Sequence, residues 1–126
     1  MDEILNQVCV EIDRARHKVV IVEGKKDARA LKNLGFNKVF CLKGPLFELV
    51  ENISADEVLV LTDLDKEGRF LFSRLSRDLS AHGVQVDNRL REALFRTDLR
   101  QIEGLETYLR GFLIRTGCDR LELWKR

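Results

Sequence analysis

The 126-residue sequence lacks several features that define large classes of protein. Its three cysteines, Cys9, Cys41 and Cys118, lie far apart and form no CxxC pair. This excludes a usual disulfide framework or zinc knuckle and fits a reducing compartment. No apolar run approaches the length of a membrane span, and Met1-Asp2-Glu3 lacks the basic start of a signal peptide. These absences favour a soluble, cytoplasmic protein with no membrane partner.

An excess of charge of one sign is also missing. The sequence has 22 Lys and Arg against 21 Asp and Glu, a formal net charge of +1. It therefore does not indicate a standing surface for polyanions, and any basic patch must be local. Hydrophobic residues make up 44%, which is enough for a core in a chain of this length. We expect a single domain in which a helix over residues 1–17 packs on a unit spanning residues 18–126.

The hydrophobic pattern alternates between two periods along the chain. Short continuous apolar runs predict buried strands at residues 19–22, 38–42, 58–61 and 84–86. Helical spacing predicts helices at 3–16, 28–34, 46–53, 66–82, 90–95 and 102–115. Strands that alternate with helices form βαβ units, so we predict an α/β, three-layer Rossmann-like fold with about four parallel strands and helices on both faces. The pattern does not fix the path of residues 87–102.

Carboxylates follow two of these strands. Asp63 and Asp65 come directly after the run at 58–61, and Glu23 follows the run at 19–22. In a doubly wound sheet these strands can be neighbours where the strand order reverses, and the three acids would then meet in one crevice. Such acids repel one another unless a proton or a cation intervenes. A hard divalent cation, Mg²⁺ or Mn²⁺, together with a substrate phosphate would satisfy that charge.

Other residues at the same strand ends could serve a phosphate ligand. Lys25, Lys43 and Arg69 are candidates for phosphate contacts, and Gly24 and Gly68 leave room for the backbone to approach a ligand. Each residue also has a simpler interpretation, since lone basic side chains are usually solvated and a lone acid often caps a helix. It is the convergence of acids on adjacent strand ends that favours a functional site.

Two motifs, each at a strand end, resemble the signature motifs of the Toprim domain: Val22-Glu23-Gly24-Lys25-Lys26-Asp27 and Leu61-Thr62-Asp63-Leu64-Asp65-Lys66-Glu67-Gly68. That domain is shared by topoisomerases, bacterial-type primases, certain DNA-repair proteins and nucleases, including one that matures ribosomal RNA. The resemblance covers roughly residues 18–110. It implies that Glu23 is a general acid/base and that Asp63 and Asp65 coordinate Mg²⁺, with Glu23 as a third candidate ligand.

Within that family the sequence is most similar to small stand-alone proteins that resemble the catalytic half of the ribosomal-RNA maturation nuclease. A topoisomerase needs a tyrosine nucleophile on a separate domain, and the only tyrosine, Tyr108, fits a packing role. A primase normally carries a zinc module, which the cysteines do not supply. Substrate grip would come from a protein partner, a homodimer or local basic residues. Trp124 is expected to anchor the C-terminal tail.

The sequence thus predicts a Mg²⁺-dependent nuclease, a hydrolase of nucleic-acid phosphodiesters, with RNA favoured over DNA. The alternative is a non-catalytic Toprim module that binds metal and nucleic-acid phosphate within an RNA-processing or DNA-repair assembly. Receiver domains and haloacid-dehalogenase-type phosphatases fit less well, because both place paired acids after the first strand. A Walker-type nucleotide site is absent, since Gly24-Lys25-Lys26 lacks the upstream glycine and the Ser/Thr.

Overall fold

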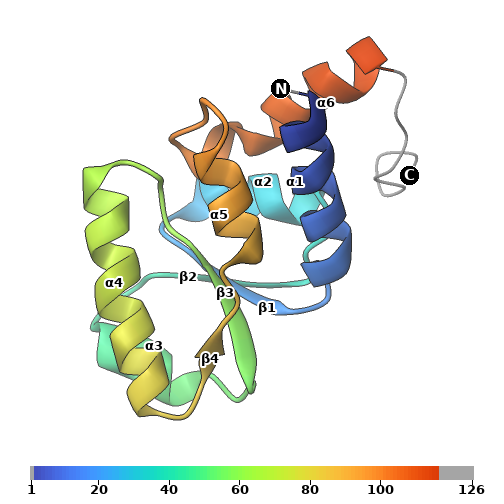
Figure 1. Ribbon diagram of the computed structural model, residues 1–126. Coiled ribbons are helices and arrows are strands. Elements are labelled where there is room, and N and C mark those ends of the chain that lie inside the picture. The colour runs from blue at the N-terminus through green and yellow to red at the C-terminus, as the bar shows by residue number, and fades with distance from the viewer. Residues whose placement is uncertain (1, 117–126) are drawn as a thin grey trace.

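The computed structural model describes residues 2–116, which form three layers: one sheet in the middle and a layer of helices on each of its faces (Figure 1). The sheet has four strands that all run parallel, in the order β2-β1-β3-β4. The strands are β1 (Val19–Val22), β2 (Lys38–Cys41), β3 (Glu57–Leu61) and β4 (Gln85–Val86). The predicted α/β fold with four parallel strands is confirmed.

Helices cover both faces of the sheet (Figure 1). One face carries α1 (Asp2–Ala15), α2 (Lys25–Asn33), α5 (Arg89–Phe95), the short 3-10 helix η1 (Ile102–Gly104) and α6 (Leu105–Thr116). The opposite face carries α3 (Leu46–Asn52) and α4 (Lys66–Ala81). No helix in this part of the chain is long and apolar enough to cross a membrane.

Both sides of each central strand are buried. Val22 and Leu61 pack with the helices of the first face, whereas Ile21 and Val60 pack with α3 and α4. Side chains of a strand point alternately to the two faces, so a strand covered on both sides needs apolar residues at every position. This explains the uninterrupted apolar runs at residues 19–22 of β1 and 58–61 of β3.

The order of the strands positions the site. β1 pairs with β2 on one side and with β3 on the other. The order in which strands are added to the sheet therefore reverses between β1 and β3, which makes this position the topological switch point. Val22, the last residue of β1, lies opposite Leu61, the last residue of β3. The predicted neighbourhood of the first and third strands is therefore confirmed, and the segments that follow them emerge side by side.

Residues 87–102, whose path the sequence does not predict, return to the carboxyl ends of the strands. After α5 the chain passes the end of β3, where the N–H of Leu64 donates a hydrogen bond of 2.8 Å to the carbonyl of Arg100. The predicted C-terminal helix begins as the 3-10 turn η1 and continues as α6. The expected role of Trp124 lies outside the described residues.

Candidate functional site

The carboxyl ends of β1 and β3 are joined through Glu23 and Asp63. The backbone N–H of Asp63 donates a hydrogen bond of 2.7 Å to Oε2 of Glu23. Oδ1 of Asp63 in turn accepts a hydrogen bond of 2.8 Å from the N–H of Ile102 in η1. Both acids are half-buried. The structure thus brings together these two predicted site residues, and it holds each side chain through a backbone N–H from a distant segment.

Asp65 lies on the exposed side of the same loop and caps α4. Its Oδ1 accepts a hydrogen bond of 2.8 Å from the N–H of Gly68, which is a usual role for Asp at a helix N-terminus. Gly68 is required by close approach, because a Cβ built there would lie 1.9 Å from the carbonyl oxygen of Asp63. Oγ1 of Thr62 donates a 2.6 Å hydrogen bond to the Gly68 carbonyl and fastens the same turn to the strand end.

One oxygen of each of the three acids is without a hydrogen bond in the described part of the chain. Within residues 2–116, Oε1 of Glu23 and the Oδ2 atoms of Asp63 and Asp65 accept none. In the same part of the chain, no group of three or more His, Cys, Asp or Glu side chains is arranged to hold a metal ion. A hard cation could therefore take one or two of these carboxylates and complete its shell with water and phosphate oxygens. This division of ligands is the one that Mg²⁺ usually adopts in proteins.

A fourth acid, Asp27, belongs to this group and was given no role by the sequence argument. It is buried in the first turn of α2, where its Oδ2 accepts a hydrogen bond of 3.0 Å from the N–H of Gly24. Burial raises the pKa of Asp27, and the negative charges of Asp63 and Glu23 raise it further, although the hydrogen bond opposes them. We call Glu23, Asp27, Asp63 and Asp65 the carboxylate site.

Arg91 is the second residue that sequence reasoning missed. Its side chain comes from α5, is only 4% exposed, and lies beneath the loop that carries the acids. Nη1 donates a hydrogen bond of 2.6 Å to the carbonyl of Thr62, and Nη2 donates one of 3.1 Å to the carbonyl of Asp63. A planar guanidinium can serve several carbonyls at once, so Arg91 fixes the course of the backbone at the end of β3.

The surroundings of Arg91 keep its charge in place. Its guanidinium lies over the rings of Phe72 and Phe95, at 4.4 and 5.3 Å from their centroids. Burial lowers the pKa of Arg91 to about 10, while the charges of Glu23 and Asp63 oppose that shift. Arg91 therefore stays a cation at neutral pH. The sequence carries no clear signal for it, because α5 also contains Arg89 and Glu92 and a single arginine on such a helix looks like an ordinary solvated charge.

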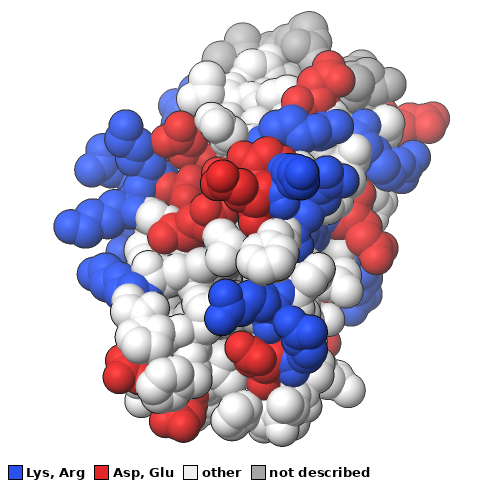
Figure 2. All heavy atoms as spheres, turned by 90° about the vertical axis from the view of Figure 1, so that its left-hand side faces the viewer, with Lys and Arg blue, Asp and Glu red and all other residues white. Residues whose placement is uncertain are grey.

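The face onto which the strands open combines both charge signs. Figure 2 shows acidic side chains gathered near its middle, with Lys and Arg side chains around them. The predicted phosphate contacts Lys25, Lys43 and Arg69 are all exposed. Lys25 and Lys43 line the same groove, whereas Arg69 borders a separate hollow beside Arg91. The structure thus brings two of the three candidates together.

Comparisons with known proteins agree with the motifs. A family model described as the Toprim domain matches residues 18–90. A UPF0292 protein from Methanocaldococcus jannaschii is 30% identical over 115 residues, which cover 85% of this chain and 88% of that protein. A UPF0292 protein from Methanosarcina acetivorans is 32% identical over 127 residues, covering 93% and 88%. A solved structure of a protein from Aquifex aeolicus superposes with a TM-score of 0.70 at 28% identity, covering 78% of this chain and 94% of that one.

Proposed function

Because the chain belongs to the Toprim domain family, we propose that it is a divalent-metal-dependent nuclease that hydrolyses phosphodiester bonds of nucleic acid. Membership indicates a metal-binding function connected with nucleic acids, since Toprim domains generally bind divalent metal ions. The observation that carries the finer proposal is the contact between Glu23 and Asp63 at the carboxyl ends of β1 and β3. It gathers acids where a parallel α/β sheet binds its ligands.

The three predicted acids have different tasks in this proposal. Asp63 and Asp65 hold Mg²⁺, or Mn²⁺, with Glu23 as a third candidate ligand. Once bound, such an ion neutralises charge on phosphate oxygens and makes water more acidic. Glu23 transfers protons as general acid/base, and the N–H of Asp63 holds its carboxylate in place. Gly68 and Arg91 hold the loop that carries Asp63 and Asp65, which we call the aspartate loop, in its position.

Our proposal favours RNA over DNA as the substrate. Its support is the similarity of the two motifs, in a chain of this size, to the catalytic half of the ribosomal-RNA maturation nuclease. The net charge of +1 gives little general affinity for polyanions. We therefore propose that a protein partner or a second copy of the chain adds to substrate grip in the cytoplasm. In this proposal the N-terminal helix of residues 1–17 packs on the Toprim domain of residues 18–126.

Two observations favour a second candidate, a non-catalytic module that binds metal and nucleic-acid phosphate within a larger assembly. One oxygen of Asp65 is occupied in capping α4, and the described residues hold no ready group of three metal ligands. Such a site would bind an ion through few protein ligands and rely on a nucleic-acid phosphate to complete it. Stable, metal-dependent binding of RNA without turnover would identify this function.

Cleavage assays separate the two functions. Structured RNA and supercoiled plasmid are incubated with the protein in Mg²⁺, in Mn²⁺ and in EDTA. We expect metal-dependent cleavage, RNA ahead of DNA, that falls about 10²- to 10⁴-fold in Glu23→Gln and in Asp63→Asn. Glu51→Gln, an exposed acid on α3, is the matched control and should keep full activity. Cleavage that persists in EDTA, or full activity in both site variants, contradicts the catalytic assignment.

A further inference from the structure

A groove of about 640 Å³ lies beside the carboxylate site, between α2 and the edge strand β2. Its described lining contains four basic residues and no acid, in contrast to the site next to it. The residues that line it are Lys25, Ala28, Arg29, Lys32, Asn33, Val39, Phe40, Cys41 and Lys43. We call this feature the basic groove. Because the whole chain is nearly neutral, four cations in one concavity are a local concentration of charge.

The basic side chains of the groove are arranged in a row. Lys25, Arg29 and Lys32 are spaced i, i+4, i+7 along α2 and so lie on one face of the helix. The row is about 10 Å long, at 1.5 Å of rise per residue. All three side chains are exposed. A row of exposed cations along a trough matches the regular negative charges of a phosphate backbone.

One end of the groove meets the carboxylate site. Lys25 follows Glu23 by two residues. On the other wall, the N–H of Leu42 donates a hydrogen bond of 2.9 Å to the carbonyl of Val22, which brings the end of β2, and Lys43 after it, beside the end of β1. A chain of phosphates lying in the groove would therefore arrive at Glu23.

Val39 and Cys41 form the apolar floor of the groove, because their side chains point to the α2 face of the sheet and pack against the core there. Phe40 lies between them in the strand and opposite Ile21, so its ring points to the other face, where α3 and α4 lie. The groove thus combines a row of cations with an apolar floor.

We propose that the basic groove binds one strand of a nucleic acid through its phosphates, which would contact Lys25, Arg29, Lys32 and Lys43. This inference rests on the proposed function, because it takes the same polymer to be the ligand of the carboxylate site. It adds a path for the substrate: the strand held in the groove leads to the carboxylate site, where the adjoining phosphodiester meets the acids.

Fluorescence anisotropy with labelled ten-nucleotide RNA tests the path in EDTA, where no cleavage interferes. The test variant is Arg29→Glu with Lys32→Glu, and the control is Arg74→Glu with Arg77→Glu, an exposed i, i+3 pair on α4 with the same change of charge. We expect at least a tenfold loss of affinity in the first variant and less than threefold in the second. The slope of log affinity against log salt should fall by about 1.4, since two phosphate contacts are lost.

Phe40→Ala is a further control. Phe40 is 39% exposed, but its ring points to the face of α3 and α4 rather than into the groove, so binding should be unchanged. All of these side chains are exposed, so melting temperatures should stay within a few degrees of the wild type and a loss of fold cannot imitate the result.

The outcomes distinguish this inference from the proposed function. Glu23→Gln removes the proton-transfer group but no groove cation, so it should bind the single strand at least as tightly as the wild type. Binding without cleavage would support the groove and contradict hydrolysis. Equal losses of affinity in the α2 and α4 variants would overturn the groove while leaving the nuclease proposal intact.

Discussion

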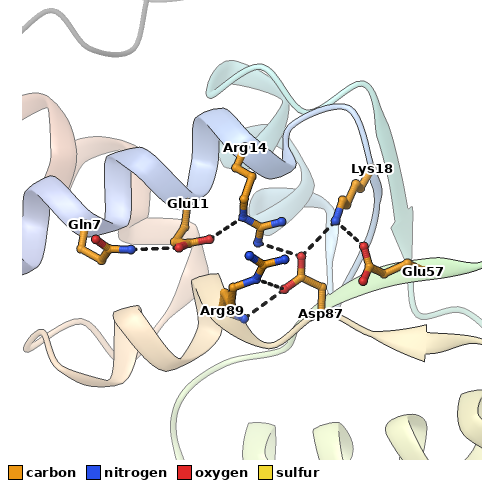
Figure 3. A network of polar contacts seen from close by, with 7 residues as sticks. All are labelled: Gln7, Glu11, Arg14, Lys18, Glu57, Asp87 and Arg89. Carbon is orange, nitrogen blue, oxygen red and sulfur yellow. Dashed lines mark hydrogen bonds and ion pairs between the residues drawn. The ribbon is translucent and has the colours of Figure 1, made fainter.

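The two edges of the sheet treat buried acids in opposite ways. Near the amino ends of β1 and β3, the Asp87 side chain is 2% exposed and is surrounded by cations (Figure 3). Its Oδ2 accepts hydrogen bonds from Arg14 at 2.7 Å and from Lys18 at 3.2 Å, and its Oδ1 accepts one of 3.1 Å from the N–H of Arg89. Burial alone would raise the pKa of Asp87, but these donors outweigh it and lower the pKa to about 2.

At the carboxyl edge the acids face one another instead. Burial and the charge of Asp63 raise the pKa of Asp27. The buried cation Arg91 donates its hydrogen bonds to backbone carbonyls rather than to the carboxylates. The Asp87 network also links α1 to β3, since Lys18 pairs with Glu57 as well as with Asp87 (Figure 3). At the amino ends of the strands, ion pairs thus neutralise the buried acid and join the layers of the fold. At the carboxyl ends, Glu23 and Asp63 are held by backbone N–H groups, so a cation would be favoured there.

The largest loss of stability should follow from removing the Asp87 carboxylate at the amino ends of the strands, which we call the paired edge. Asp87→Asn leaves Arg14 and Lys18 without their buried partner, and we expect the free energy of unfolding to fall by about 3 kcal/mol. The control is Glu57→Gln, whose side chain is 37% exposed and whose loss should cost less than about 1 kcal/mol. Urea unfolding at pH 7 measures both. Equal losses in the two variants would show that burial does not set the strength of this network.

Acid titration sharpens the same contrast. The folded-state pKa of Asp87 is about 2, below its ordinary value of 3.8, so its pairing stabilises the protein at every pH above the ordinary value. That contribution, about 2 kcal/mol, is lost as the pH falls from about 4 to 2. In Asp87→Asn this part of the acid dependence should be missing. An unchanged profile of stability against pH between 4 and 2 would contradict the assignment.

At the carboxyl ends of the strands, the substitution expected to lower stability most is at Gly68. Gly68→Ala places a methyl group 1.9 Å from the Asp63 carbonyl oxygen, so the start of α4 or the aspartate loop must move, at a cost of about 2 kcal/mol. Gly111→Ala, an open position within α6, should be neutral or stabilise the protein by up to about 1 kcal/mol. Thermal unfolding of both variants decides whether close approach, rather than helix propensity, selects glycine at position 68.

A smaller effect is expected from Arg91→Lys. The charge is retained, but an ammonium cannot reproduce the fork that reaches Thr62 and Asp63, and about 1–2 kcal/mol of stability should be lost. Arg89→Lys at the paired edge is the control, because its side chain is 60% exposed and its loss should be a few tenths of a kcal/mol. Denaturant unfolding of the two variants should therefore differ clearly, and equal midpoints would argue against a positioning role for Arg91.

The smallest effect should have the opposite sign. The pKa of Asp27 is raised on folding, so its ionised form is disfavoured in the folded state and stability is lost as the pH rises through this pKa. Asp27→Asn removes that penalty and keeps an oxygen for the N–H of Gly24. We expect a slight gain in melting temperature at pH 7 that disappears at pH 3. A loss of stability at pH 7 would show that Asp27 is compensated like Asp87.

The strands and their order could be predicted because they depend on local patterns. β1 and β3 are continuous apolar runs, and acids at their ends point to neighbouring strands at a switch point. Contacts across long stretches of chain could not be predicted in this way. The N–H of Ile102 reaches Asp63 from 39 residues away, and Arg91 reaches Thr62 from 29. Both depend on how η1 and α5 pack, which no local spacing encodes.

The Asp87 network escaped prediction for the same reason. Arg14 and Asp87 are 73 residues apart, and each by itself looks like an ordinary surface charge in the sequence. The hydrogen bonds of Asp65 and Asp27 also compete with any role toward a ligand. Asp65 is the N-cap of α4, whereas Asp27 lies in the first turn of α2 and accepts from the N–H of its N-cap, Gly24. The sequence therefore predicts that Glu23, Asp63 and Asp65 come together, whereas the hydrogen bonds show which oxygen of each acid has no partner within the described residues.

The most direct test of the contrast between the two edges is the effect of Mg²⁺ on thermal unfolding of the wild type, Asp63→Asn and Asp87→Asn. Binding to the folded state at tenfold excess over the dissociation constant adds about 1.4 kcal/mol, which corresponds to a few degrees. We predict that Mg²⁺ raises the melting temperature of the wild type and of Asp87→Asn, from its lower starting point, but not that of Asp63→Asn. An equal rise in all three proteins, or none in the wild type, would contradict a cation site at the carboxyl edge.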